Sequence, residues 1–394
     1  MKVLTKKSRL GYNMIVKIKS RPAKYLYLQI YHSLKQQIEK GKLVKGEIIP
    51  SEYALADKFR VSRVTIRQAL LKLQREKYLV RKRGYGTEIS YSPEVKRDEK
   101  AIAVMLVDIT RPFFAEILKG IQGKLDQEGY KLILCDTENS SEKERDYFSK
   151  YTGSVAGFIV APATGNQNHA YYGGLLAEKI PFVFVDRHLP EFNVDAVLSD
   201  NVQGGYLATK YLLDLGHKQI AVLSEPEATS LSERIDGYKK ARLEYGLPEN
   251  ENLIFRGEKR GGPAGYHFIR EVIENRPEVT AAFCLNDDIA WGALKRLAEM
   301  KINIPQDFSV LGFDNLDFTS NLYPSLTTVN QLKYQMGEKA ADILLGQITG
   351  KLTNKKVVFS FPVELVVRES TGKARVRTLA KTQTVLRGEI CAGP

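Results

Sequence analysis

The spacing of apolar residues changes near residue 100, and the two parts of the chain predict different folds. Before residue 100, apolar residues recur every three or four positions over short stretches, which is the period of amphipathic helices. After it, near-continuous apolar runs alternate with stretches of helical period. Such runs are typical of strands that a parallel sheet buries on both faces. We therefore expect a small, mainly helical N-terminal domain followed by a large α/β domain.

Two short helices joined by a tight turn are predicted between residues 50 and 73. The second helix carries one apolar stripe, at spacings of 0, +3, +4 and +7, formed by Ile66, Ala69, Leu70 and Leu73. Arg63 and Arg67 are four residues apart, so they share a face outside that stripe. Such a helix suits the major groove of DNA, where one arginine can bond both O6 and N7 of a guanine. The alternative is a solvated basic helix within some larger domain.

Charge is distributed unevenly along the chain. Of the 394 residues, 59 are Lys or Arg and 46 are Asp or Glu, which gives a net charge of +13. Residues 1–90 alone contain 22 Lys and Arg against 6 Asp and Glu, whereas residues 101–370 are net acidic. A basic head on a mildly acidic body favours nucleic acid as the partner of the head and a different partner for the body.

A wing is predicted after the second helix, where short β-prone runs flank a basic Gly-x-Gly turn, and an amphipathic helix is predicted upstream over residues 25–42. This order of elements is that of a winged helix-turn-helix. Residues 23–90 resemble the GntR family DNA-binding domain, through the motifs IPSE at 49–52, VSRVTIR at 61–67 and GYGT at 84–87. The resemblance implies binding to double-stranded operator DNA.

The expected DNA contacts fall into three groups. The two arginines of the recognition helix are expected to contact bases or adjacent phosphates, and three polar residues around them to fix the register. The basic residues of the wing are expected to reach phosphates or the minor groove, since glycine lets the backbone approach a surface closely. The full set is Glu52, Ser62, Arg63, Thr65, Arg67, Lys82, Arg83, Gly84 and Gly86.

The remaining segments outside the large domain are polar. Residues 1–22 are predicted to form a basic extension, 91–100 a linker, and 371–394 a flexible basic tail. We find no secretory or membrane-spanning segment, so we expect a cytoplasmic protein with no membrane partner. The three cysteines are far apart and lack a CxxC spacing, so we expect neither a disulfide framework nor a metal site.

Residues 101–370 are predicted to form two lobes with parallel sheets. Apolar runs that read as strands occur at 101–107, 130–135, 155–160, 182–185, 219–223, 281–285 and 308–313. Residues 101–370 are more than one doubly wound sheet usually needs, and they are enough for two lobes with one sheet each. Ligands of such sheets bind beyond the carboxyl ends of the strands. The residues to examine are therefore Asp108, Asp136, Ala161, Asp186, Ser224, Asn286 and Asp314.

Several stretches of this domain resemble the LacI/GalR effector domain, which shares the periplasmic-binding-protein-like fold. They include RPFFAEI at 111–117, ERIDGY at 233–238, GFDN at 312–315 and PSLTTVNQ at 324–331. The resemblance implies two lobes joined by crossover strands, with a small ligand in the cleft between them. It also implies that four polar residues point into the cleft, namely Arg234, Asn286, Asp314 and Gln331.

Carboxylate, guanidinium and amide groups together suit a polyol, because they accept and donate hydrogen bonds to several hydroxyl groups. Two aromatic residues after the first strand could cover the apolar face of a sugar ring. The expected ligand contacts are Phe113, Phe114, Asp186, Arg187, Arg234, Asn286, Asp314 and Gln331. Each assignment has an alternative. Asp314 and Arg234 could pair only with each other, and Asn286 could cap the helix that follows it. Phe113 and Phe114 could be ordinary core residues.

The combination of both domains resembles the AraR group of carbohydrate-responsive bacterial repressors. That resemblance implies a homodimer on a two-fold operator, released when a monosaccharide closes the cleft, with L-arabinose as the leading effector. Another sugar, a nucleobase or an activating role are the alternatives. A solute-binding protein would need export, and an enzyme would need a nucleophile or an acid–base pair. Asp186 and Asp314 could be proposed as such a pair, but no nucleophile motif accompanies them. No cofactor is expected.

Overall fold

The computed structural model describes residues 26–39, 43–82, 86–91, 98–165, 167–226, 228–351 and 356–375. The chain divides into two compact units, residues 1–96 and 97–394. The predicted basic extension at 1–22, Arg83, Gly84 and most of the predicted tail lie outside the described residues. Among the helices that are described, none has the length and apolar character needed to cross a bilayer.

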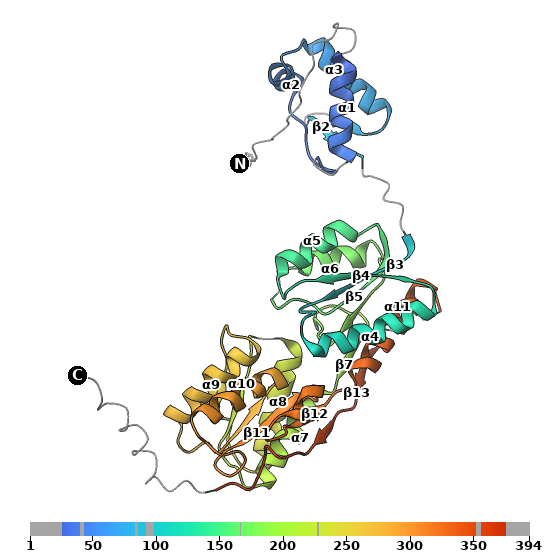
Figure 1. Ribbon diagram of the computed structural model, residues 1–394. Coiled ribbons are helices and arrows are strands. Elements are labelled where there is room, and N and C mark those ends of the chain that lie inside the picture. The colour runs from blue at the N-terminus through green and yellow to red at the C-terminus, as the bar shows by residue number, and fades with distance from the viewer. Residues whose placement is uncertain are drawn as a thin grey trace, which may run out of the picture. The chain divides into compact units, whose positions relative to one another are not determined.

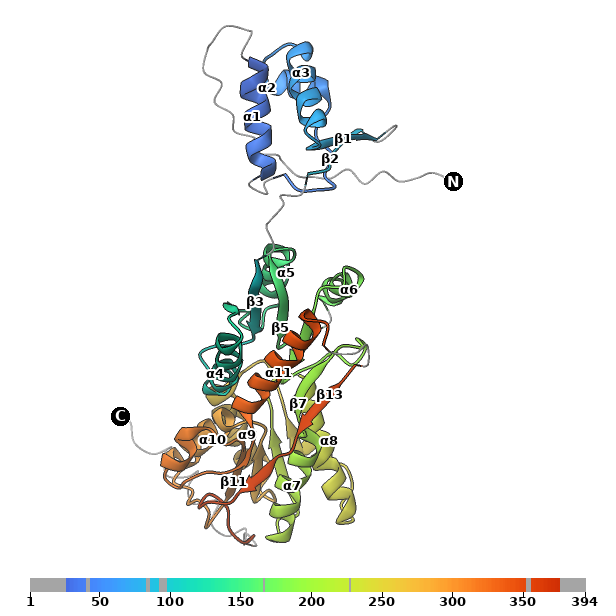
Figure 2. The same ribbon diagram turned by 90° about the vertical axis from the view of Figure 1, so that its right-hand side faces the viewer.

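The N-terminal unit is the predicted winged helix-turn-helix (Figures 1 and 2). It contains α1 (Leu26–Glu39), α2 (Glu52–Phe59), α3 (Arg63–Arg75) and an antiparallel hairpin of β1 (Leu79–Lys82) and β2 (Gly86–Ile89). Serine hydroxyls cap α2 and α3, because Ser51 and Ser62 each accept a hydrogen bond from the N–H three residues further on. The apolar stripe of α3 is buried against the apolar face of α1, as predicted.

The larger unit has two lobes, each built on a six-stranded sheet between two pairs of helices. The first sheet is parallel, in the order β13 (Val358–Phe361), β7 (Ala196–Ser199), β6 (Phe182–Val185), β5 (Val155–Val160), β3 (Asp98–Leu106) and β4 (Lys131–Asp136). Alternate residues of β3 pack against different helices: α4 (Pro112–Gln127) and α11 (Lys333–Ile348) on one face, α5 (Ser141–Tyr151) and α6 (His169–Ala177) on the other.

The second sheet has the order β14 (Glu364–Val366), β12 (Thr327–Asn330), β11 (Ser309–Asp314), β10 (Ala281–Cys284), β8 (Ile220–Leu223) and β9 (Ile254–Phe255). Only the β14–β12 pair within this sheet is antiparallel. The pair α7 (Asn201–Asp214) and α8 (Thr229–Glu244) covers one face, and the pair α9 (Gly261–Asn275) and α10 (Asp287–Glu299) covers the other.

The chain passes between the lobes where β7 leads to α7, where β12 leads to α11, and where β13 leads to β14 (Figures 1 and 2). These crossings confirm the predicted two-lobed arrangement. The seven apolar runs predicted as strands correspond to β3, β4, β5, β6, β8, β10 and β11. The four-residue strand β7 was not predicted, and it is buried throughout although it lacks a long apolar run.

Both ends predicted for the large domain need correction. Strand β3 begins at Asp98, so the last three residues of the predicted 91–100 linker belong to the sheet. At the other end, the chain packs beyond residue 370. Gly372 accepts a hydrogen bond from His217 and donates one to Ser309, and the Ala374 N–H bonds the Leu215 carbonyl. The first residues assigned to a flexible tail are therefore part of the second lobe.

Glycines set how closely the helices of each pair approach. A Cβ added to Gly237 of α8 would lie 2.1 Å from the Val202 carbonyl oxygen of α7, and one added to Gly205 of α7 would lie 2.0 Å from the Arg234 carbonyl oxygen of α8. The α4–α11 and α9–α10 pairs have reciprocal glycines of the same kind. Since Arg234 lies on α8, the close α7–α8 contact also fixes the position of a predicted ligand residue.

We predict that Gly237→Ala lowers the free energy of unfolding of the large unit by about 1–3 kcal/mol, because the added methyl group forces two backbones apart. Urea unfolding followed by the fluorescence of Trp291, the chain's one tryptophan, reports on this unit. Gly174→Ala in α6 is the matched control, since an added Cβ there meets no atom within 4 Å. It should be neutral or stabilising by up to about 1 kcal/mol. Equal midpoints for Gly237→Ala and the unsubstituted protein would contradict the close packing.

Candidate functional site

The recognition helix presents its polar residues as the sequence predicts. Arg63 and Arg67 are both exposed on α3, outside the buried stripe. Ser62 and Thr65 lie at the start of the helix, where the Ser62 hydroxyl accepts a hydrogen bond from the Thr65 N–H at 3.2 Å and bonds its hydroxyl at 2.8 Å. These two residues therefore have a structural role in capping α3.

Glu52 links the two helices of the helix-turn-helix. The Arg67 side chain donates to Glu52 from Nη2 at 2.9 Å and from Nε at 3.1 Å. This hydrogen bond lowers the pKa of the Glu52 carboxyl. The guanidinium group is thus held in place across the α2–α3 turn. Tyr53, which the sequence analysis did not name, is 73% exposed beside Glu52. It lines a groove of about 800 Å³ together with Arg63 and Arg67.

The described part of the wing is short. Lys82 pairs with Glu88 across the hairpin, with 2.6 Å between Nζ and Oε2. Gly86 has a φ of +113°, and a Cβ there would lie 3.0 Å from the Ile48 side chain, so a larger residue would strain the turn. Arg83 and Gly84 are outside the described residues.

In the large unit, seven of the eight predicted ligand residues line one cavity of about 40 Å³ between the lobes. The residues from the first lobe lie at the start of α4 and at the end of β6. Those from the second lobe lie on α8 and at the ends of β10 and β11. The seven are Phe113, Phe114, Asp186, Arg187, Arg234, Asn286 and Asp314. The strand-end rule accounts for Asp186, Asn286 and Asp314, which lie at the ends of β6, β10 and β11. The other strand-end residues named from the sequence do not line this cavity, namely Asp108, Asp136, Ala161 and Ser224.

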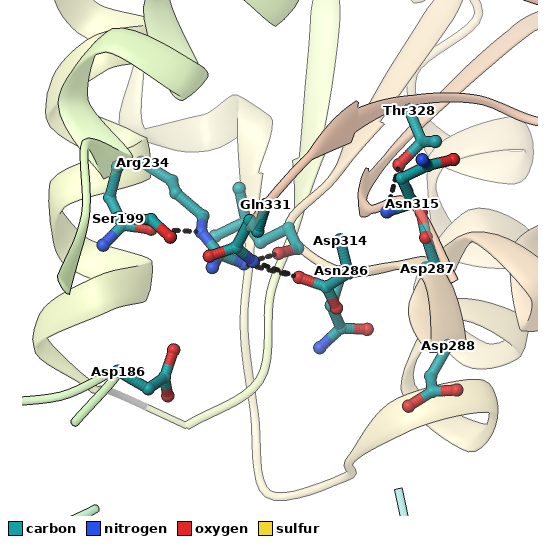
Figure 3. A network of polar contacts seen from close by, with 12 residues as sticks. Asp186, Ser199, Arg234, Asn286, Asp287, Asp288, Asp314, Asn315, Thr328 and Gln331 are labelled. Carbon is teal, nitrogen blue, oxygen red and sulfur yellow. Dashed lines mark hydrogen bonds and ion pairs between the residues drawn. The ribbon is translucent and has the colours of Figure 1, made fainter. Parts of the chain in front are cut away.

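The eighth residue, Gln331, is bound to the cavity wall (Figure 3). Its Nε2 donates to Asp314 Oδ1 at 2.6 Å, and Arg234 Nη1 lies 3.6 Å from the same oxygen. Arg234 is held from behind, since Nε donates to Asn201 Oδ1 at 2.9 Å and Nη1 donates to the Leu285 carbonyl. Burial raises the pKa of the Asp314 carboxyl well above its ordinary value, although Arg234 acts in the opposite direction.

One buried polar atom at this site, Gln331 Oε1, has no hydrogen-bond partner among the described residues, whereas Arg187 Nε lies 3.5 Å from Asp186 Oδ2. Buried polar atoms are normally satisfied, so Gln331 Oε1 is a candidate ligand contact. Two of the carboxylates also sit on backbone with positive φ, +122° at Asp314 and +64° at Asp186. Such a conformation is costly for a residue other than glycine and tends to occur at functional sites.

Asn286 proves to be occupied by protein contacts. Its Oδ1 accepts a hydrogen bond from the Ile289 N–H at 2.8 Å and so caps α10, which confirms the alternative stated for it. Its Nδ2 donates to Glu225 Oε1 at 2.9 Å. Phe113 and Phe114 likewise serve two purposes, because both belong to the first lobe's core and both line the cavity.

Sequence reasoning missed three charged residues of the cavity wall: Arg111, Glu225 and Asp288. Glu225 is 3% exposed and accepts hydrogen bonds from Arg111, from the Gly261 N–H and from the asparagine above. Burial raises its pKa, but these partners outweigh burial and the pKa lies below its ordinary value. Their positions in the sequence could have identified two of them. Glu225 comes two residues after β8, and Arg111 is the first residue of the RPFFAEI motif at 111–117.

Comparisons with known proteins agree with both units. Residues 26–89 match the gntR family of bacterial regulatory proteins, and residues 209–371 match a periplasmic binding protein-like domain. The chain is 32% identical over 355 residues to the arabinose metabolism transcriptional repressor of Geobacillus stearothermophilus, covering 88% of this chain and 97% of that protein.

Two further similarities cover roughly 70% of the chain. The chain is 35% identical over 291 residues to the HTH-type transcriptional repressor PurR of Vibrio atlanticus, covering 72% of this chain and 86% of that protein. A LacI family transcriptional regulator from Enterococcus faecium, solved with bound ribose, is 31% identical with a TM-score of 0.63 and covers 70% of this chain and 100% of its own.

These relatives are regulators and not enzymes, and the Geobacillus repressor is matched over almost its whole length. The chain thus belongs to the family of bacterial transcriptional repressors in which a GntR-type winged helix-turn-helix precedes a periplasmic-binding-protein-like effector domain.

Proposed function

We propose that this repressor binds a two-fold operator as a homodimer in the cytoplasm and is released when a neutral monosaccharide binds between the lobes of its effector domain. The observation that carries the proposal is the cluster of predicted residues around one buried polar cavity. An effector can act in this way only if its affinity differs between the DNA-bound and released states.

The chemistry of the cavity favours a neutral polyol over an anion. Three guanidinium groups and four carboxyl groups line it, so the cavity lacks the excess of positive charge that would favour an anionic ligand. The carboxyl oxygens can accept hydrogen bonds from sugar hydroxyls, and the guanidinium groups can donate to them. L-arabinose is the leading effector because the Geobacillus relative is an arabinose metabolism repressor. Ribose is the second candidate, since the Enterococcus structure contains it.

A second copy of the chain is proposed to dock on the α9–α10 face. Trp291 of α10 is 47% exposed beside a groove of about 640 Å³ whose wall is mainly apolar, with Pro263 and Tyr266 of α9. A large exposed aromatic residue beside an apolar groove is typical of an association surface. Pairing of effector domains would bring two DNA-binding heads to one operator.

For the DNA-binding head, we predict that Arg67→Ala weakens operator binding roughly 5- to 150-fold, because a bidentate contact to guanine is lost. Arg75→Ala removes the same charge from the exposed far end of α3 and should have a much smaller effect. Fluorescence anisotropy at one fixed salt concentration measures both, since phosphate contacts make affinity salt-dependent. Equal losses in the two variants would show that Arg67 contributes only charge.

For the effector site, we predict that Asp314→Asn weakens L-arabinose binding roughly 10-fold or more, because one of the two carboxyl oxygens that can accept hydrogen bonds is replaced by an NH₂ group that can only donate. Operator binding without sugar should remain, since the DNA-binding head is a separate unit. Titration calorimetry and a gel-shift assay measure the two properties. Asp317→Asn, at an exposed position nearby, is the control. Sugar binding of normal strength in Asp314→Asn would remove this residue from the site.

For the homodimer, we predict that Trp291→Ala weakens association at least roughly 30-fold, as expected for a central aromatic residue at an interface. Leu243→Ala is the control, because Leu243 is a large apolar residue on α8 that is 72% exposed outside the groove. Sedimentation velocity over a range of concentrations compares them. A dimer of unchanged strength in Trp291→Ala would place the interface elsewhere.

A further inference from the structure

The backbone that carries Asp314 to the effector cavity is strained. Asp314, the last residue of β11, has a φ of +122°, and Asn315 after it has a φ of +52°. Residues other than glycine rarely take a positive φ, and they keep it only where the surrounding structure holds them. The direction of the Asp314 carboxyl group depends on this backbone conformation. The contacts that hold the backbone therefore also decide where the carboxyl group points.

One ammonium group holds this strained segment. Lys333 is the first residue of α11, where the chain enters the first lobe from β12. Its Nζ donates to the Asp314 carbonyl at 2.6 Å, to the Asn315 carbonyl at 3.3 Å and to the Gln331 carbonyl at 3.3 Å. Three acceptors match the three N–H donors of an ammonium group, and a charged donor makes a stronger hydrogen bond than a neutral one. Lys333 thus ties the end of β11 to the residue that follows β12.

The other contacts of Asn315 hold different groups. Its N–H donates to Thr328 Oγ1 at 3.3 Å (Figure 3). Its side chain bonds Asn330 Oδ1 at 3.1 Å and accepts from Arg368 Nη2 at 2.7 Å. None of these bonds restrains the carbonyl groups of residues 314 and 315, which accept hydrogen bonds from Lys333. The ammonium group therefore supplies a restraint that these bonds do not.

Lys333 lies behind the cavity wall and not on it. It is not among the residues that line the cavity, whereas Asp314 is. Burial raises the pKa of the Asp314 carboxyl, and the charges of Arg234 and Lys333 oppose that rise. The ammonium group therefore favours the ionised carboxylate, in which both oxygens accept hydrogen bonds. It does so without taking a position that a ligand would occupy.

We propose that Lys333 is a positioning residue of the effector site, which fixes the strained backbone at Asp314 and Asn315 and so directs the Asp314 carboxyl group toward the ligand. The proposal rests on the proposed function, in that it takes this cavity as the effector site. Loss of the ammonium group leaves every residue of the cavity wall in the chain. It should still weaken sugar binding, because the carboxyl group is no longer held in one direction before the ligand arrives.

The test compares Lys333→Met and Lys333→Arg with the unsubstituted full-length protein, by calorimetry with L-arabinose and with ribose. Lys333→Met removes the charged donors and should bind sugar at least roughly five-fold more weakly. Lys333→Arg keeps a charged donor group and should lose less affinity. Lys339→Met is the control, because it removes the same charge from α11 at a position where the ammonium group pairs with Asp342 of the same helix at 3.8 Å. Equal affinity in Lys333→Met and the control, or equal losses in both variants at position 333, would overturn the proposal.

A second measurement does not depend on the identity of the effector. The Asn315 N–H bonds Thr328, and the Leu316 N–H donates to Asp287 Oδ2 at 2.9 Å. Without sugar, hydrogen exchange at these two amides should be faster in Lys333→Met than in Lys339→Met, because the segment is less restrained. Unchanged exchange would overturn the positioning role. Faster exchange, with neither sugar bound by the unsubstituted protein, would instead refute the proposed effector and leave the positioning role intact.

Discussion

The burial of charge between two lobes is the constraint on which the effector domain depends. Asp314 and Arg234 are almost completely buried, and such groups are tolerated only when they are paired and hydrogen-bonded. Arg234 meets that need through Asn201 on the neighbouring helix, and it can do so because glycines let α7 and α8 pack backbone to backbone. The position of the Arg234 guanidinium group therefore depends on the close packing of α7 and α8. A substitution that moves these helices apart would also displace Arg234.

The same arrangement explains why the lobes can move as bodies. Each lobe has its own sheet and its own pairs of helices, with apolar cores on both faces of each sheet. The contacts across the cleft include polar ones, as in the Arg111–Glu225 pair and the His188–Thr229 hydrogen bonds. Opening the cleft exchanges these contacts for water, whereas distorting a lobe would expose close-packed apolar surface. The strand crossings are thus the natural place for movement.

The sequence predicts the elements better than the contacts between them. Long apolar runs mark the buried strands, and the strand-end rule then places Asp186 and Asp314 at the cleft without further information. The Arg111–Glu225 pair could not be predicted in this way, because it depends on how the two lobes meet. The double use of Asn286 also depends on tertiary contacts, since its amide caps α10 and holds Glu225. Gly372 was assigned to a tail because its partner, His217, is far away in the sequence.

The response of the effector domain depends on how differently a ligand binds the two states. An effector that moves a two-state equilibrium from about 1:99 to 99:1 must prefer one state by roughly 10⁴-fold. Asp186 and Arg187 belong to the first lobe, whereas Arg234 and Asp314 belong to the second, and all four line one cavity. A ligand can bond both sets at once only when the lobes are close together, so its hydroxyl pattern has to match buried polar groups of both lobes. A ligand that bonds one set alone would bind either arrangement of the lobes and would shift the equilibrium little.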